Sequence, residues 1–284
     1  MRVLHVAVLM LAGRSLCAQQ PPRPAPNGVN FYSLEKEAAL GKQMAEEFRR
    51  HTAPVESPAV QDYVARLGQR IAAQVPDAKF PFTFSVIADD PCPTVHEPAA
   101  LPGGYIFVPA ALIAAALDEG EFAGMLAHAM EHIVQRHGTR QATRDQLIGS
   151  PDALAGSWTG GCMSGQIPQA VPMGVLPFLR SNELEADALA VQTMARTGFD
   201  PAALPRYIER VQSQTSGSLA KVFSPLPDRK QRVASLQRLI EKMPPATYAA
   251  PGEEFTAIQQ EVRRRMEQHP PAGDAPTLMR RDSK

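Results

Sequence analysis

The sequence is poor in the features that mark several specialised classes of protein. Its 284 residues contain 3 cysteines, too few for a disulfide-rich fold. Lysine plus arginine and aspartate plus glutamate number 29 each, so no net charge favours a nucleic acid or an anionic membrane as partner. Beyond the first residues, no stretch approaches the about 20 apolar residues that a membrane-spanning helix needs. We therefore expect a globular protein without a nucleic-acid partner and, once its N-terminal segment is removed, without a membrane span.

The N-terminus has the pattern of a secretory signal peptide. Arg2 supplies a positive start, residues 3–12 are apolar, and small residues before and at Ala18 favour cleavage there. We predict a signal peptide at residues 1–18 and an extended, proline-rich leader at residues 19–27, with the alternative of an apolar N-terminal helix. The signal implies export to the periplasm or the cell exterior. In such an oxidising compartment Cys92 and Cys162 either pair or remain free thiols, and the sequence does not decide between them.

The spacing of apolar residues predicts a mostly helical chain with a small sheet, an α+β protein. Serines at 33 and 57 are expected to cap two N-terminal helices. Alternation predicts strands at 82–88 and 105–108, separated by a loop over 89–98 and a glycine turn at 102–104. Further helices are expected at 110–117, 118–137 (ended by Gly138), 183–197 (capped by Asn182), 201–214, 228–242 and around Phe255, Ile258 and Val262.

The same pattern divides the chain into a main domain and a tail. We expect one domain over residues 28–243, followed at 244–284 by a short helix and a disordered tail. Within the domain, residues 149–177 are rich in glycine and proline and lack periodicity. A loop of this length is either a functional lid or a disordered insert.

Two histidines lie four residues apart in the most apolar of these helices. At about 100° per residue, His128 and His132 lie only about 40° apart on the helix surface, which suits a divalent metal. The common zinc-hydrolase motif, H-E-x-x-H, has a glutamate after its first histidine that acts as general base. Here that position is Ala129, and Glu131 instead precedes the second histidine, as in the inverted motif H-x-x-E-H.

A catalytic zinc needs a third protein ligand, and the acidic segment at residues 183–187 offers one. Glu183 and Asp187 share a helix face, so one carboxylate can bind the metal while the other accepts a hydrogen bond from a ligating histidine. Glu185 points elsewhere. His137 is rotated by about 140° from His132 and is better explained as a helix-end cation or a buried, hydrogen-bonded histidine. The alternative for the whole group is two core histidines with ordinary surface carboxylates.

Three segments together resemble the zinc metallopeptidases related to HtpX and BepA, the family that also contains the CAAX prenyl endopeptidase. The resemblance extends over about residues 28–240 and implies a gluzincin-type fold, with helices around a small mixed β-sheet. It implies one zinc per chain on His128, His132 and Glu183, with Asp187 supporting a ligand. The segments are residues 100–107, residues 126–132 with His137 and Gly138, and residues 183–187 with residues 198–201.

The resemblance also implies a mode of substrate binding. The turn formed by Gly103, Gly104 and Tyr105 is expected to lead into the edge strand of the sheet, where glycines allow close approach and an extended polypeptide adds as a further strand. Family members of the exported type are associated with proteolysis and quality control of envelope proteins. The substrate class implied is therefore extended or misfolded polypeptide.

Two positions depart from the family pattern. Ala129 stands where the family has its general-base glutamate, and Ser224 stands where it usually has a histidine thought to stabilise the oxyanion. Glu131 lies about 80° to the opposite side of the histidine pair, so as a catalytic base it requires water to approach from the other flank. Two hypotheses follow: a zinc metalloendopeptidase with Glu131 as base, or an inactive pseudoprotease that serves as a polypeptide-binding scaffold or chaperone.

Overall fold

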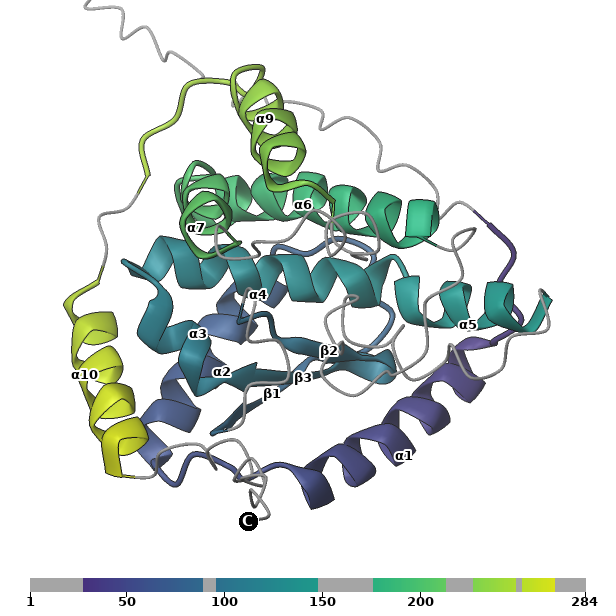
Figure 1. Ribbon diagram of the computed structural model, residues 1–284, viewed down its shortest axis with the longest axis horizontal. Coiled ribbons are helices and arrows are strands. Elements are labelled where there is room, and N and C mark those ends of the chain that lie inside the picture. The colour runs from purple at the N-terminus through teal and green to yellow at the C-terminus, as the bar shows by residue number, and fades with distance from the viewer. Residues whose placement is uncertain (1–27, 89–95, 148–175, 213–226, 249–251, 269–284) are drawn as a thin grey trace, which may run out of the picture.

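The computed structural model describes residues 28–88, 96–147, 176–212, 227–248 and 252–268 (Figure 1). Helices predominate, as expected. The elements in chain order are α1 (Leu34–His51), α2 (Pro58–Ala72), β1 (Thr83–Ile87), β2 (Ala99–Leu101), the 3-10 turn η1 (Pro102–Gly104), β3 (Tyr105–Pro109), α3 (Ala110–Ala115), α4 (Glu119–Val134), α5 (His137–Leu147), α6 (Leu176–Thr197), α7 (Ala203–Val211), α9 (Arg229–Ile240) and α10 (Glu253–Gln268).

The sheet is small and mixed, in agreement with the expected fold class. Its strand order is β1-β3-β2, with β1 parallel and β2 antiparallel to β3. The three-residue strand β2 was not predicted, and it changes the meaning of the glycine turn. Tyr105 begins β3, the central strand, so the expectation that the turn leads into the edge strand is wrong. Among the described residues β2 is an edge, while β1 is bordered by a bridge from Pro54 to Ile87.

The glycines of this region allow the protein's own backbone segments to approach one another. Gly103 and Gly104 have φ angles of 77° and 98°, which favour glycine. A Cβ atom at Gly104 would lie 2.0 Å from the carbonyl oxygen of Pro81. On α1, a Cβ atom at Gly41 would lie 1.8 Å from the carbonyl oxygen of Pro102. Helix α1 therefore crosses the η1 turn at Gly41.

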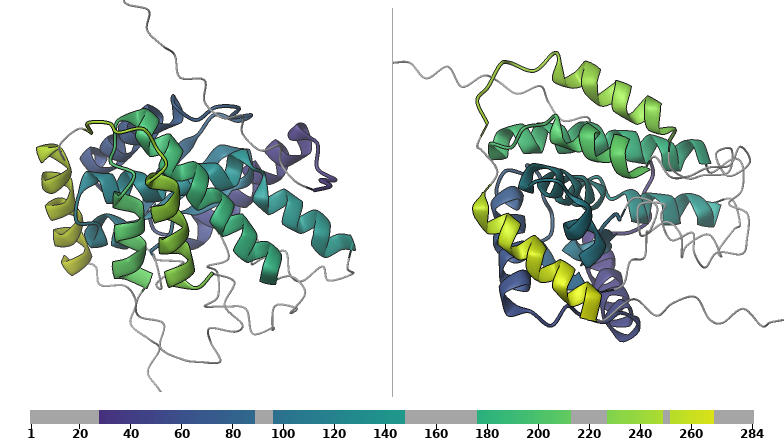
Figure 2. Two further views of the ribbon diagram at one scale, coloured as in Figure 1. Left: turned by 90° about the horizontal axis from the view of Figure 1, so that it is seen from above. Right: turned by 60° about the vertical axis from the view of Figure 1, so that its left-hand side comes forward.

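Helix α4 forms the centre of the molecule. It lies between the sheet and α6 (Figure 1), and α9 packs on the side of α6 that faces away from α4 (Figure 2). Asp118 caps its N-terminus by accepting a hydrogen bond from the backbone N–H of Glu121. Every residue from Glu121 to Val134 is buried, including both histidines. Buried polar side chains need hydrogen-bond or metal partners, so the neighbours of the two histidines determine which role these side chains can have.

Two helix boundaries differ from those expected. Helix α4 ends at Val134, because Arg136 adopts a left-handed conformation (φ 56°) and donates hydrogen bonds to Glu37 and to the carbonyl oxygen of Tyr32. Gly138 then lies in the first turn of α5 and does not end the helix. Helix α6 begins at Leu176, so Asn182 is an interior residue and not an N-cap.

The C-terminal helix α10 is longer than the short helix expected and belongs to the main core. Phe255, Ile258 and Val262 are buried in the same hydrophobic cluster as α4. The ring of Phe255 stacks on that of Phe122, with centroids 5.7 Å apart. A domain boundary at residue 243 therefore does not separate α10 from the core.

None of the described helices is long and apolar enough to cross a membrane. Several sequence predictions lie outside the described residues: the signal peptide, the leader, Cys92, Cys162, Ser224, most of the segment 149–177 and the tail after residue 268.

Candidate metal centre

The two histidines of α4 present their Nε2 atoms to each other. The helical spacing of four residues brings Nε2 of His128 and Nε2 of His132 to 3.1 Å. His128 is fully buried and His132 nearly so. Two imidazole nitrogens at this distance on one helix face can form half of a metal site.

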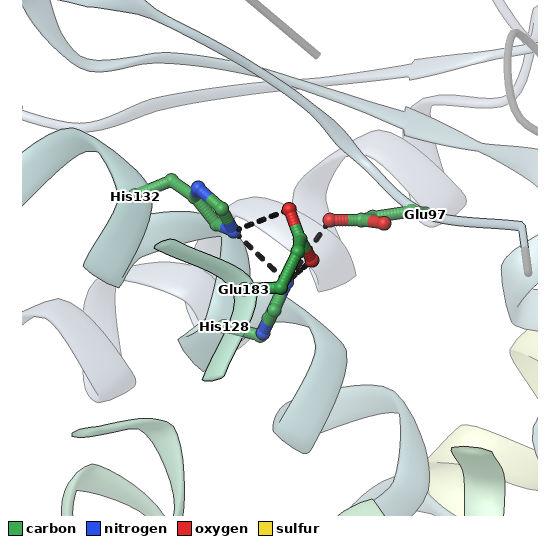
Figure 3. A group of neighbouring side chains, drawn as sticks. All are labelled: Glu97, His128, His132 and Glu183. Atoms are coloured by element: carbon green, nitrogen blue, oxygen red, sulfur yellow. Dashed lines mark hydrogen bonds and ion pairs between the residues drawn. The ribbon is translucent and has the colours of Figure 1, made fainter. Parts of the chain in front are cut away.

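Helix α6 brings the third donor that the sequence indicated. Oε2 of Glu183 lies 3.4 Å from Nε2 of His128, and its Oε1 lies 3.5 Å from Nε2 of His132 (Figure 3). The close packing of α4 and α6 places this carboxylate, which is 2% exposed, over the histidine pair. Glu183 is thus placed to bind the same ion as both histidines.

A fourth donor, Glu97, was missed by the sequence analysis. Its Oε1 lies 3.0 Å from Nε2 of His128, and one ligand atom from each of the four residues lies within 4.8 Å of the others. Glu97 precedes β2 by two residues, and its carboxylate lies beside that of Glu183, on the side away from His132 (Figure 3). A single glutamate in a segment without periodicity carries no sequence signal. Its role depends on the fold alone.

The donor set fits a tetrahedral cation such as zinc. Ligand atoms about 2.0–2.1 Å from a zinc ion are about 3.3 Å from one another in a tetrahedron. Four of the six separations, the three that involve His128 and the one between His132 and Glu183, run from 3.0 to 3.5 Å, and the whole set lies within 4.8 Å. Within the described part of the chain, the buried atoms Glu97 Oε2 and Glu183 Oε2 have no hydrogen-bond partner. Buried carboxylate oxygens are stable when a cation neutralises them.

A buried ion pair orients His128. Its Nδ1 lies 2.9 Å from Oδ1 of Asp187, one turn after Glu183 on α6, as the sequence analysis proposed. Arg232 of α9 binds the same carboxylate through two hydrogen bonds of 2.7 Å. Arg232, also missed from the sequence, fixes Asp187 and so fixes the tautomer of His128 that leaves Nε2 free for a metal.

His132 is oriented by a second chain of contacts. Its Nδ1 lies 3.1 Å from Nδ1 of His137, and Nε2 of His137 lies 3.0 Å from Oε2 of Glu185. His137 is therefore the buried, hydrogen-bonded histidine that was one of its two expected roles. When Nδ1 of His132 donates to His137, Nε2 of His132 remains available as a ligand.

The pKa values of the group reflect its concentration of negative charge. Burial acts to lower the pKa of His128, but hydrogen bonds with three carboxylates, that of Asp187 first, outweigh burial and place this pKa well above its ordinary value. Burial and the charge of His128 lower the pKa of His132 well below its ordinary value. Burial, with the negative charge of Glu97, raises the pKa of Glu183 to about 7. The negative charge of the surrounding carboxylates thus favours the protonated, positively charged form of His128.

Glu131 is not part of this group. It is fully buried, and its Oε1 accepts a hydrogen bond of 2.8 Å from the hydroxyl of Thr193 on α6. This position on the flank of α4 agrees with the helical geometry of the motif. The structure therefore brings together His128, His132, Glu183 and Asp187 of the expected site, but it does not bring Glu131 to them.

Comparison with known proteins agrees with a peptidase assignment. Over 226 residues the chain is 26% identical to the beta-barrel assembly-enhancing protease of Escherichia coli (strain K12), covering 75% of this chain and 45% of that protein. It is 28% identical over 194 residues to the Yersinia pestis protein of the same name, covering 64% and 39%. It is 28% identical over 217 residues to the mitochondrial metalloendopeptidase OMA1 of Schizosaccharomyces pombe, covering 73% and 62%.

The chain therefore spans less than half the length of the two beta-barrel assembly-enhancing proteases. The model of Peptidase family M48 matches residues 56–240. This range contains all four donors and both residues of the Asp187–Arg232 pair. Because the match covers more than half of the chain, the protein belongs to peptidase family M48.

Proposed function

We propose that the protein is an exported, gluzincin-type zinc metalloendopeptidase that cleaves extended or misfolded polypeptide slowly. The observation that carries this proposal is the convergence of His128, His132 and Glu183 at 3.1 to 3.5 Å in a buried group. Membership of a peptidase family supports the reaction class. The N-terminal pattern of residues 1–18 supports export.

Each residue of the site has a defined task in this reaction. His128, His132 and Glu183 would hold one zinc ion, and Asp187 with Arg232 would keep Nε2 of His128 directed at it. Zinc polarises a peptide carbonyl and lowers the pKa of water. Ala129 supplies no carboxylate to accept a proton, which costs about 10²–10⁴ in rate. This is why we expect slow cleavage.

An extended polypeptide would bind along the edge strand β2. This strand neighbours α4 and, among the described residues, pairs with β3 on one side only. Main-chain pairing with a sheet edge selects for extended segments and is tolerant of their sequence. Gly103, Gly104 and Tyr105 would contribute to substrate binding indirectly, by closing the β2–β3 hairpin whose register pairs Leu101 with Tyr105.

A second candidate function is a pseudoprotease that binds polypeptide as a scaffold or chaperone. Two observations favour it. Ala129 leaves the general-base position without a carboxylate, and Glu131 is bonded to Thr193 outside the metal-binding group. Such a protein would bind zinc and unfolded polypeptide without hydrolysis.

Zinc content and cleavage of a denatured protein substrate distinguish these functions. We expect about one zinc per chain, and cleavage by the Ala129→Glu variant that is about 10²–10⁴ faster than that by wild type. The double variant Ala129→Glu/Ser224→His tests the oxyanion position in addition. Absence of wild-type cleavage with activity in Ala129→Glu would establish the pseudoprotease, and folded protein without zinc would refute the metal site.

The Glu131→Gln variant serves as an internal control. Because Glu131 lies outside the metal-binding group, we expect its removal to leave cleavage per bound zinc unchanged. If Glu131→Gln keeps its fold and its zinc but loses cleavage, then Glu131 is the catalytic base.

A further inference from the structure

We infer that Glu97 is a fourth protein ligand, so that the zinc site has a closed set of two histidines and two glutamates. This inference rests on the proposed binding of zinc at the site, but not on peptide hydrolysis. It concerns the position that catalytic zinc sites leave open for water or substrate.

The distance between Glu97 and His128 favours direct ligation. Oε1 of Glu97 lies 3.0 Å from Nε2 of His128 in hydrogen-bonding geometry, on the side where this nitrogen presents its lone pair to a metal. The separation equals that between the two histidine nitrogens to within 0.1 Å, since the latter is 3.1 Å. A carboxylate that acts through a water molecule would stand further from the ligating nitrogens, because the water lies between them. The distance of Glu97 from His128 is therefore that of a direct ligand, within a set of four donor atoms that spans 4.8 Å.

The burial of Glu97 also favours direct ligation. Glu97 is 2% exposed, and its Oε2 has no hydrogen-bond partner among the residues described. A second buried carboxylate, that of Glu183, lies in the same group. Two buried carboxylates repel each other unless a cation lies between them. Direct ligation by both would pair each carboxylate with the cation, whereas without a metal the contact of Glu97 within this group is with His128.

The fourth ligand differs from the others in how it is held. His128, His132 and Glu183 are interior residues of α4 and α6, so helical hydrogen bonds hold their backbone in place. Glu97 lies in a non-helical segment two residues before β2. Of the four donors, Glu97 would therefore be the one most directly affected when a polypeptide pairs with the β2 edge.

The test measures zinc affinity of the full chain by competition with a chromogenic chelator. Glu97→Gln keeps the size of the side chain and removes the anionic ligand, so we expect a loss of affinity of at least about 10–100-fold. Glu97→His replaces one ligand type by another and should recover part of the loss. The matched control is Glu121→Gln, since Glu121 is equally buried on α4 but pairs with Arg206 and Arg210 away from the group.

Cobalt(II) replacing zinc gives a second readout. Its visible absorption should be unchanged by azide in the wild type, whose four positions are filled, and should change in Glu97→Gln, where one position is open. Wild-type affinity in Glu97→Gln would overturn the inference, as would retained affinity with loss of cleavage, which would make Glu97 a base. A wild type that binds no zinc would refute the proposed metal site itself.

Discussion

At the scale of single residues, Arg232 shows how much the metal-binding group depends on a side chain outside it. Arg232 is fully buried and holds Asp187 through two hydrogen bonds. Removing one partner of a buried pair costs about 3–5 kcal/mol, because the other charge remains buried. We expect Arg232→Met to lower the free energy of unfolding by this amount in urea titrations with a chelator present. Zinc affinity should fall about 10–100-fold, because His128 loses its fixed orientation.

The control for this prediction is Arg238→Met on the same helix. Arg238 is exposed, and its hydrogen bond is to the carbonyl oxygen of Ala234 within α9. A stability change within about 0.5 kcal/mol is expected there. Equal effects of the two variants would mean that the buried pair adds nothing specific to the site.

Glu37 gives a pH dependence that is separate from the metal. Burial raises the pKa of its carboxyl group, although hydrogen bonds with Arg136 and Thr139 act in the opposite direction. Its pKa in the unfolded chain is about 4.3, so the folded protein binds more protons between the two values. The contribution to stability is fully present below the unfolded pKa and is lost as the pH rises through the folded pKa. The stability of wild type relative to Glu37→Gln should therefore fall as the pH rises from about 4.

Glu35→Gln, two residues away, should show the opposite trend. A hydrogen bond with its own backbone, followed by one with Ser33, lowers the pKa of Glu35. Its contribution is present above the unfolded pKa and is lost on acidification. Unfolding free energies of wild type and both variants, measured from pH 4 to 7 with chelator present, test these trends. A Glu37 contribution that rises with pH, or a Glu35 contribution that falls, would contradict the prediction.

The sequence predicts the part of the site that lies within single helices. His128 with His132, and Glu183 with Asp187, follow from the spacing of four residues. Glu97 and Arg232 contact their partners across 31 and 45 residues of sequence. No spacing rule applies to such contacts, since they depend on how separate elements pack. The turn of Glu131 towards Thr193 likewise becomes evident only when α6 is in place.

At the scale of elements, the crossing of α1 over the η1 turn depends on Gly41. In a helix interior, alanine is normally more stable than glycine by about 0.5–1 kcal/mol. At Gly41 the added Cβ would lie 1.8 Å from the carbonyl oxygen of Pro102. We therefore expect Gly41→Ala to destabilise the protein by about 1–3 kcal/mol, as overpacked substitutions do. Thermal and urea unfolding with chelator present would measure it.

Gly252→Ala is the comparison for this variant. The nearest atom to a Cβ there is Oε2 of Glu119 at 3.6 Å, an ordinary contact. Its effect should be close to zero or stabilising. If Gly41→Ala is also stabilising, then α1 is free to move away from η1 and the close packing is not required.

Elements with strong periodicity are those that the sequence predicts best. Helices α1 and α2 begin directly after their expected caps, because a capping residue and an apolar stripe coincide there. Helix α9 begins one residue after its expected start at Asp228, which is its N-cap. Strand β2 has three residues, too few for alternation to be detected. The end of α4 was misplaced because a left-handed arginine, held by Glu37, takes the position that glycine usually fills. Strand β2 and the end of α4 depend on tertiary contacts, which cannot be predicted from the local sequence.

At the scale of the whole molecule, a bound zinc would join three separate parts of the fold. The donors come from α4, from α6 and from the segment before β2. A ligand that binds only the folded state stabilises it by about 2.7 kcal/mol at a free concentration of 100 Kd. For a chain of this size we expect a chelator to lower the Tm by about 5–10 °C from that of the zinc-saturated protein.

This shift should disappear in His128→Ala, whose site lacks its central ligand, and persist in His51→Ala, since His51 is exposed at the end of α1. A chelator that shifts the Tm of wild type and that of His128→Ala equally would be acting elsewhere.

Because three donors lie on α4 and α6, zinc should also protect the backbone amides of these helices from hydrogen exchange more than those of α10. Equal protection of all three helices would mean that zinc protects the amides only by making global unfolding rarer. The four donors would then unfold together with the entire core, as one cooperative unit.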